Sequence, residues 1–166
     1  MLTVLLSTAL LFPTVIGKNL HGDRFTLPEG FTGSINIVLV AFQREQQPEV
    51  DTWLPLVKEL EAETPELVRY WELPTISSGY KWMSFIIDNG MRSGIPDSTA
   101  RERTITLYID RSPMLEALEI PNTEEIEVYV LDANGYVRWR DRGPRTDTGA
   151  AGLRSAVGEL IRGDRE

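Results

Sequence analysis

The chain has 166 residues, of which 42% are hydrophobic and 25% are charged, and these values are typical of one folded globular domain. Seventeen basic and 25 acidic residues give a net charge of −8, which disfavours nucleic acid and anionic membrane surfaces as partners. Cysteine is absent, and its absence excludes disulfides, thiolate nucleophiles, zinc–sulfur sites and iron–sulfur clusters.

The N-terminal residues form an apolar run, Met1–Phe12, which is shorter than the roughly 20 residues that span a bilayer. We therefore predict no integral membrane span there. The run resembles the apolar part of an export signal, but no basic residue precedes it and no small-x-small cleavage site follows. A leading strand or helix, or a start codon placed late in a longer signal or anchor, are the alternatives. We expect an apolar segment at 1–11 and a domain at 12–166, in a compartment that the sequence does not specify.

The first half of the chain predicts a hairpin followed by a β-α-β unit. Residues 15–20 and 24–27 flank a glycine-containing turn. Residues 35–42 form a nearly continuous apolar run, which indicates a strand buried on both faces. Apolar residues at intervals of three and four predict a helix over 50–63, and alternation predicts a strand over 67–73. Because such crossovers are right-handed, the two strands of the unit should be parallel.

The second half predicts two further helices, a strand, a hairpin and a C-terminal helix. A helix is expected over 80–92, with Tyr80, Met83, Ile87 and Met91 on its inner side. A strand at 104–109 and a short helix at 110–118 follow. Asn134-Gly135 favours a tight turn between strands at 126–131 and 136–139. The C-terminal helix reaches Ile161, and Asp147 or Thr148 should lie near its N-cap.

This order of elements resembles the thioredoxin superfamily, and in particular its peroxiredoxin-like branch, over residues 12–162. In that branch an extra strand and helix precede the final hairpin, and here they would be the segments at 104–109 and 110–118. Val128–Arg138 resembles the final hairpin motif of the branch. The resemblance implies an α/β fold with a central mixed β-sheet flanked by helices.

The thioredoxin resemblance also shows what this chain has lost. Redox members carry the attacking cysteine after the first central strand, at the start of a helix that lowers the thiol pKa. Here that segment is Gln43–Glu49, which contains Arg44, Gln46 and Gln47. Ile126 or Glu127 stands where redox members have a cis-proline. We expect Arg44, Gln46 and Gln47 either to line a former active-site cleft that binds a carboxylate or acidic peptide, or to form a polar loop and helix cap.

A narrower set of motifs is similar to the assembly-factor family of the mitochondrial ATP synthase. These motifs are spread over most of the chain: Phe12–Leu20 with Leu27-Pro28, Val50–Trp53, Ile87–Arg92 with Ile95-Pro96, and Val137–Trp139 with Gly143. The resemblance implies a chaperone-like role in assembling a membrane complex, exerted through a protein surface. A generic cysteine-free relative of the superfamily is the alternative.

We identify no catalytic residues, metal site or cofactor in the sequence. His21 is the single histidine and lies in a predicted turn, so a metal site would need carboxylates alone. Glu124, Glu125 and Glu127 are expected on a solvated face. Neither a serine-hydrolase elbow nor a phosphate-binding loop is present.

The segment after the final hairpin turn holds one basic cluster in this acidic chain. Arginine beside tryptophan is the composition enriched at interface hot spots. The cluster is therefore either an interaction surface or a hairpin end with local ion pairs; its members are Arg138, Trp139, Arg140, Arg142 and Arg145.

We predict a non-catalytic binding or assembly protein with a protein partner. The assembly-factor resemblance implies that this partner is a subunit of a membrane complex such as ATP synthase. The alternatives are a degenerate enzyme or small-ligand binder that uses the former active-site cleft, and a structural domain that docks within a larger complex. A pair of buried carboxylates with opposed pKa values would favour the enzyme. An exposed apolar patch would favour the docking domain.

Overall fold

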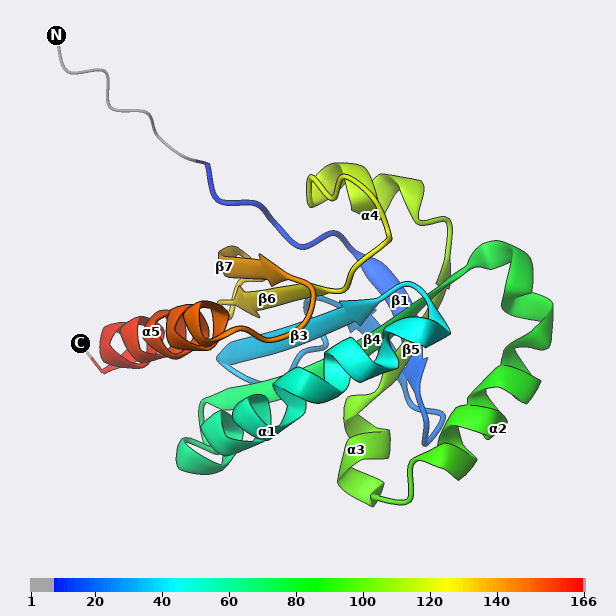
Figure 1. Cartoon of the computed structure of the whole chain (residues 1–166), viewed down its shortest axis with the longest axis horizontal. Helices are drawn as coiled ribbons and strands as arrows, with labels where there is room; N and C mark the ends of the chain where they lie inside the picture. The colour runs from blue at the N-terminus through cyan, green and yellow to red at the C-terminus, as the bar shows by residue number, and fades with distance from the viewer. Residues whose placement is uncertain (1–7, 166) are drawn as a thin grey trace, which may run out of the picture.

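The computed structural model describes residues 8–165, which form a mixed seven-stranded sheet flanked by helices (Figure 1). The strand order is β2-β1-β5-β4-β3-β6-β7. The strands are β1 (Val15–Asn19), β2 (Arg24–Leu27), β3 (Ile35–Ala41), β4 (Val68–Ser77), β5 (Ile105–Ile109), β6 (Glu127–Leu131) and β7 (Val137–Arg142). The helices are α1 (Gln47–Glu63), α2 (Ser84–Gly94), α3 (Ser98–Arg103), α4 (Ser112–Ala117) and α5 (Asp147–Asp164), with 3-10 turns η1 (Arg44–Gln46) and η2 (Ser78–Met83).

The predicted fold class is confirmed. The N-terminal hairpin is β1–β2, and the inserted strand and helix are β5 and α4, which precede the β6–β7 hairpin. Most of the apolar segment predicted at 1–11 lies outside the described residues. Where the description begins, Leu11 bridges to Tyr136, and Phe12 is buried beneath the sheet's final hairpin. None of the described helices is both long and apolar enough to cross a membrane.

The two central strands, β3 and β4, pair in parallel along their whole common length. Ile35 is opposite Val68 and Ala41 is opposite Pro74, while β6 pairs with the other edge of β3 in the antiparallel sense. This confirms the β-α-β unit. The alternation predicted over 67–73 is wrong, because β4 has helices and loops on both sides and five of those seven side chains are buried.

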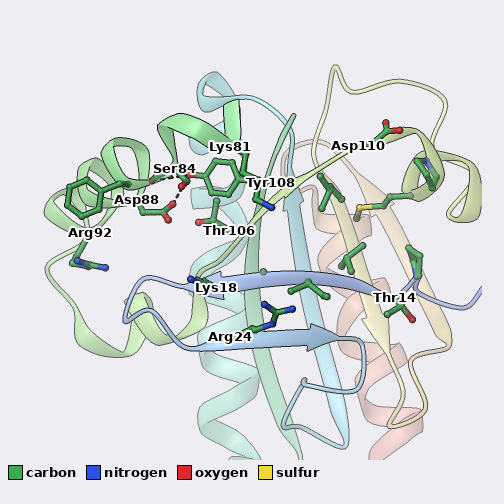
Figure 2. A pocket seen from close by; sticks show the side chains of 18 of the residues that line it. Thr14, Lys18, Arg24, Lys81, Ser84, Asp88, Arg92, Thr106, Tyr108 and Asp110 are labelled. Atoms are coloured by element: carbon green, nitrogen blue, oxygen red, sulfur yellow. Dashed lines mark hydrogen bonds between the residues drawn. The ribbon is translucent and has the colours of Figure 1, made fainter. Parts of the chain in front are cut away.

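The β1 and β5 strands touch at only one end. Their register has two pairs, Lys18 with Thr106 and Asn19 with Ile105, and the strands diverge beyond these pairs (Figure 2). Gly17 lies at the point of divergence. A Cβ there would lie 2.6 Å from Cδ2 of Leu107 and 2.7 Å from the Thr106 carbonyl oxygen, so glycine permits the close approach.

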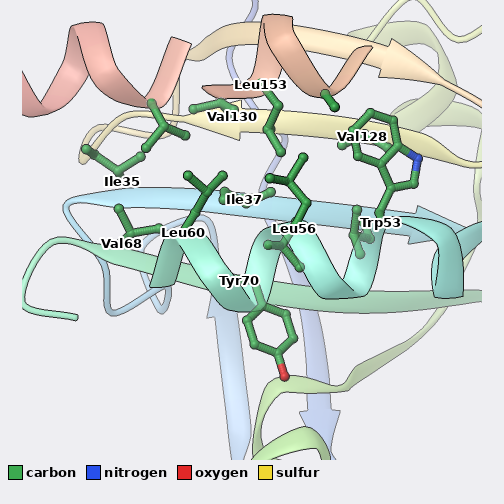
Figure 3. Close-up of a cluster of buried hydrophobic side chains, with 14 of the residues drawn as sticks. Ile35, Ile37, Trp53, Leu56, Leu60, Val68, Tyr70, Val128, Val130 and Leu153 are labelled. Atoms are coloured by element: carbon green, nitrogen blue, oxygen red, sulfur yellow. The ribbon is translucent and has the colours of Figure 1, made fainter. Parts of the chain in front are cut away.

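Two hydrophobic clusters hold the fold, one on each face of the sheet. On one face, α1 and α5 pack on the central strands (Figure 3). There Trp53 is fully buried, and its indole Nε1–H donates to the Gly143 carbonyl at 2.9 Å, which ties α1 to the turn after β7. On the other face, α4 covers a cluster that contains Phe12, Trp71 and Tyr129.

The segment predicted as a single helix over 80–92 differs most from expectation. It is a 3-10 turn followed by α2, and Tyr80 is 55% exposed instead of facing inward. No residue of α2 is buried, because the helix lies against the diverging end of β5 and not on the central sheet. Thr146, not Asp147 or Thr148, caps α5 by accepting from the Gly149 N–H, and α3 was not predicted.

The contact at Gly17 leads to a stability prediction. We expect Gly17→Ala to lower the free energy of unfolding by about 2 kcal/mol, because the added methyl group meets backbone and two buried side chains. Gly90→Ala, in an open position on α2, is the matched control and should raise stability by about 0.5–1 kcal/mol. Urea unfolding measures both, and an unchanged stability of Gly17→Ala would contradict the close approach.

Candidate functional site

The loop between β3 and α1 is where the sequence predicts the former active site. Gln46 lies at its centre and is only 3% exposed. Its Oε1 accepts from the N–H of Phe42 at 2.8 Å and from that of Gln43 at 3.2 Å, and its Nε2 donates to the Thr123 carbonyl at 2.9 Å. Every hydrogen-bonding atom of the amide is thus used inside the protein, and the carboxamide joins the end of β3 to the loop before β6.

The backbone just before β6 is also tied to the start of α1. The Ile126 N–H donates to Oε2 of Glu49, in the first turn of the helix, at 3.2 Å. The thioredoxin resemblance predicts that Ile126 or Glu127 stands where redox relatives have the cis-proline. The Gln43 side chain adds a second bond to the Thr123 carbonyl at 3.0 Å. These contacts close the space between the two segments from within.

The other two predicted residues of this loop lie at the surface. The Gln47 Nε2 donates to Oδ1 of Asp51, one turn along α1, at 2.9 Å. Arg44 lies in the exposed part of η1. The structure therefore separates the predicted trio, with Gln46 in the interior and Arg44 and Gln47 outside, and a ligand-binding role for the three remains a prediction.

Two glutamates are buried in the sheet, and sequence reasoning missed the first. Glu72 interrupts the apolar residues of β4. Burial raises its pKa to about 7, although a hydrogen bond from Gln47 acts to lower the pKa. Glu127 is 2% exposed and pairs with Nε of Arg142 at 2.5 Å, so the solvated position expected for it is wrong. Burial raises the pKa of Glu127 too, and Arg142 opposes the shift.

The two buried glutamates do not form an acid–base pair. Glu72 alternates with Tyr70 and Val68, which face α1, whereas Glu127 alternates with Tyr129 and faces the cluster under α4. They therefore lie on opposite faces of the sheet, and both of their pKa values move upward. Within residues 8–165 no group of three His, Cys, Asp or Glu side chains is placed to hold a metal ion.

The predicted basic cluster is divided by the pleat of β7. Trp139 faces α5 and packs edge-to-face on Trp53, with ring centroids 6.2 Å apart. Arg140 points to the opposite face, where it donates to the Leu118 carbonyl at 2.9 Å. Each arginine has a local carboxylate partner: Arg138 with Asp132, Arg140 with Glu119, Arg142 with Glu125 and Glu127, and Arg145 with Asp147. A role in partner binding stays a prediction for this cluster.

One hollow of the described structure lies away from the former active site. It is the opening between the diverging β1 and β5, bordered by α2 and by the start of α4, with a volume of about 760 Å³ (Figure 2). Sequence reasoning missed it because its walls come from segments that are far apart in the chain. The exposed Phe85 of α2 lies on its border.

Comparison with known families gives one match that covers nearly the whole chain. The family model described as ATP10 protein matches residues 6–160. No curated protein matches the chain.

Solved structures similar to the chain are thioredoxin-like. BsSco, a member of the Sco family of cytochrome c oxidase assembly proteins, is 14% identical, with a TM-score of 0.62 over 90% of this chain and 95% of that chain. A putative electron transport protein from Aquifex aeolicus VF5 is 14% identical, with a TM-score of 0.66 over 95% and 99%. The lipoprotein thioredoxin Etrx1 of Streptococcus pneumoniae TIGR4 is 14% identical, with a TM-score of 0.58 over 89% and 99%. At this identity the likeness shows the fold alone.

The buried carboxamide of Gln46 should be important for stability. We expect Gln46→Ala to lower the free energy of unfolding by about 2–3 kcal/mol, because it leaves two buried N–H groups and a carbonyl without partners. Glu45→Ala, one residue earlier and exposed, should change stability by less than about 0.5 kcal/mol. Chemical denaturation measures both variants. If both lose the same free energy of unfolding, Gln46 does not hold the loop.

Glu72 should make stability depend on pH. Its pKa is raised from 4.5 to about 7 in the folded state, so the folded protein binds this proton more tightly and loses stability as pH rises between these values. The free energy of unfolding of Glu72→Gln, relative to that of the wild type, should therefore be higher at pH 8 than at pH 4 by roughly 2–3 kcal/mol. Glu66→Gln, at an exposed position, is the control. Unfolding curves at the two pH values that show no difference between the variants would contradict this account of Glu72.

Proposed function

Because this chain belongs to the ATP10 protein family, we propose that it is a non-catalytic, chaperone-like assembly factor for a membrane complex. The complex is ATP synthase, as the motif resemblance implies, and the chain acts by binding a protein subunit during assembly. It performs no thiol redox chemistry, since the chain contains no cysteine.

The family match over residues 6–160 is the observation that carries this proposal. The arrangement of the loop between β3 and α1 supports the non-catalytic part of it. A thioredoxin-like active site needs a reactive group at the N-terminus of α1. Here that place holds Gln46, whose amide is occupied by three internal hydrogen bonds.

The exposed face of α2 supports action through protein contacts. Phe85 is 77% exposed and Ile86 is 66% exposed, and Tyr80 lies exposed just ahead of them. Large apolar side chains that gather at the surface are common at protein interfaces. The same observation favours the second candidate, a structural domain that stays docked within a larger complex.

Affinity purification from the native cell tests the proposal. A tagged copy of the chain, cross-linked before lysis, should recover ATP synthase subunits in amounts well above those recovered with a tagged redox-active thioredoxin of the same cell. Deletion of the gene should lower the amount of assembled complex on native gels, while the mRNAs of the subunits remain present. Stable recovery with the finished complex would favour the docked domain, and recovery of no ATP synthase subunit would contradict the assembly role.

A further inference from the structure

The opening between β1 and β5 presents unpaired strand edges. Asn19 bonds to the β2 side, since its N–H donates to the Asp23 carbonyl and its carbonyl accepts from Gly22. Backbone groups alternate between the two sides of an antiparallel strand, so those of Lys18, Ile16 and Thr14 point toward β5. Lys18 is paired there with Thr106, whereas Ile16 and Thr14 have no partner in the β1–β5 register. The edge of β1 is therefore free at Ile16, and Thr14 lies directly before the first residue of the strand.

Unpaired basic side chains surround this edge. Lys18 lies directly opposite Arg24 on β2 and opposite Thr106 on β5, so these residues form a row across three strands. Lys81 and Arg92 line the α2 side of the same opening (Figure 2). Among residues 8–165 none of these four cations has a carboxylate within ion-pair distance, although the chain as a whole is acidic.

The two acidic residues of the opening do not neutralise this charge. The Asp88 Oδ1 accepts from the Tyr108 hydroxyl at 2.7 Å, which directs it to the wall formed by β5 and α2. The Asp110 Oδ1 accepts from the Ser112 N–H at 3.1 Å and belongs to the turn before α4. The opening is thus lined by four cations, of which Arg92 also donates to the Leu20 carbonyl at 2.6 Å, and by two carboxylates. This excess of positive charge favours a carboxylate-bearing ligand.

The remaining lining combines apolar side chains with the polar ones of Thr14, Ser84, Asn89, Thr106 and Tyr108, and one of these polar groups is an exception to normal hydrogen bonding. Ile16 and Phe85 are exposed on either side of the opening, and Met114 contributes to its floor. The exception is Thr106, which is 2% exposed and whose Oγ1 has no hydrogen-bond partner among the described residues. A buried hydroxyl without a partner is rare in folded proteins, and this one lies beside Lys18 in the wall of the opening (Figure 2).

We propose that the opening between β1 and β5 binds an extended segment of a partner protein that carries both acidic and apolar side chains. The segment adds to the free edge of β1 at Thr14 and Ile16, as peptides do in β-strand addition. Its carboxylates lie near Lys18, Arg24, Lys81 and Arg92, and its apolar side chains contact Ile16 and Phe85. This inference rests on the proposed function in one respect, that the chain works by binding proteins.

The free backbone edge favours a peptide over a lipid or a simple anion. A phosphate group or a lipid headgroup would satisfy the lysines and arginines but leave the N–H and carbonyl groups of Ile16 and Thr14 unused. An extended peptide satisfies both, because its own backbone groups recur with the spacing of a strand. Ile16 and Lys18 lie on the same face of β1, so this face of the strand offers the segment both an apolar side chain and a cation.

Peptide titration of the isotope-labelled chain tests the site directly. The probe is a peptide with the core Glu-Val-Asp-Val-Glu, and its counterpart has the core Lys-Val-Lys-Val-Lys. We expect the acidic peptide alone to shift the amide resonances of Thr14 and Ile16 and to slow their hydrogen exchange. Lys18→Glu/Lys81→Glu should weaken its binding by about tenfold or more, whereas Lys58→Glu/Arg162→Glu, which changes the net charge equally at exposed positions elsewhere, should leave it unchanged.

A second pair of variants tests the backbone contact. Ile16→Pro removes the N–H that faces the opening and leaves the side of β1 that bonds to β2, and proline is tolerated on strand edges. It should abolish the binding that Ile16→Val, which keeps the N–H, retains. If Ile16→Pro does not fold, as its amide spectrum would show, the lysine variants decide the question.

Four outcomes would overturn the inference. Two concern the peptides: the acidic and basic peptides bind equally well, or Lys18→Glu/Lys81→Glu binds the acidic peptide as well as the wild type does. The other two concern other ligands: millimolar inorganic phosphate displaces the peptide, or the protein binds vesicles of phosphatidylglycerol and no peptide. The inference and the proposed function can fail separately. Peptide binding at Ile16 without recovery of ATP synthase subunits from the cell would overturn the assembly role alone, and recovery of subunits without peptide binding would overturn this site alone.

Discussion

The side chain of Gln46 holds together the part of the fold where a thioredoxin-like protein would carry out its chemistry. One buried carboxamide accepts from two successive backbone N–H groups at the end of β3 and donates to the loop before β6. The bond between Ile126 and Glu49 runs parallel to it. Buried polar groups without partners are costly, so these contacts keep the loop, the start of α1 and the start of β6 in one arrangement.

The end of the sheet at β1 and β5 is less completely paired than its centre. The sheet retains two well-packed cores, but its β1–β5 end is paired over only two residues and carries the exposed apolar side chains of α2. Four cations that have no ion pair among residues 8–165 border the opening between β1 and β5, while the arginines of β7 pair locally. The molecule thus combines a rigid centre with an incompletely paired edge, which suits a protein that binds segments of other proteins.

The sequence was sufficient for the architecture because the central elements have strong periodic signals. The apolar run at 35–42, the helix after it and the Asn134-Gly135 turn each predict one structure, and the protein has all three. It was insufficient for Tyr80, for Glu72 and for the opening between β1 and β5. The spacing of Tyr80 is that of a buried helix position, but its side chain is 55% exposed. Glu72 is buried by α1, which is distant from it in the sequence. The opening depends on where two distant strands stop pairing, which local pattern does not record.

Amide hydrogen exchange at Phe42 and Ile126 tests most directly whether the former active site is closed by internal hydrogen bonds. Both N–H groups bond to side chains, Phe42 to Gln46 and Ile126 to Glu49, at a place that is an open cleft in a redox-active thioredoxin fold. If the account is right, both amides exchange nearly as slowly as those of the central strand β3. Exchange at the rate of exposed loop amides would contradict it, and would return the loop at 43–49 to consideration as an accessible binding cleft.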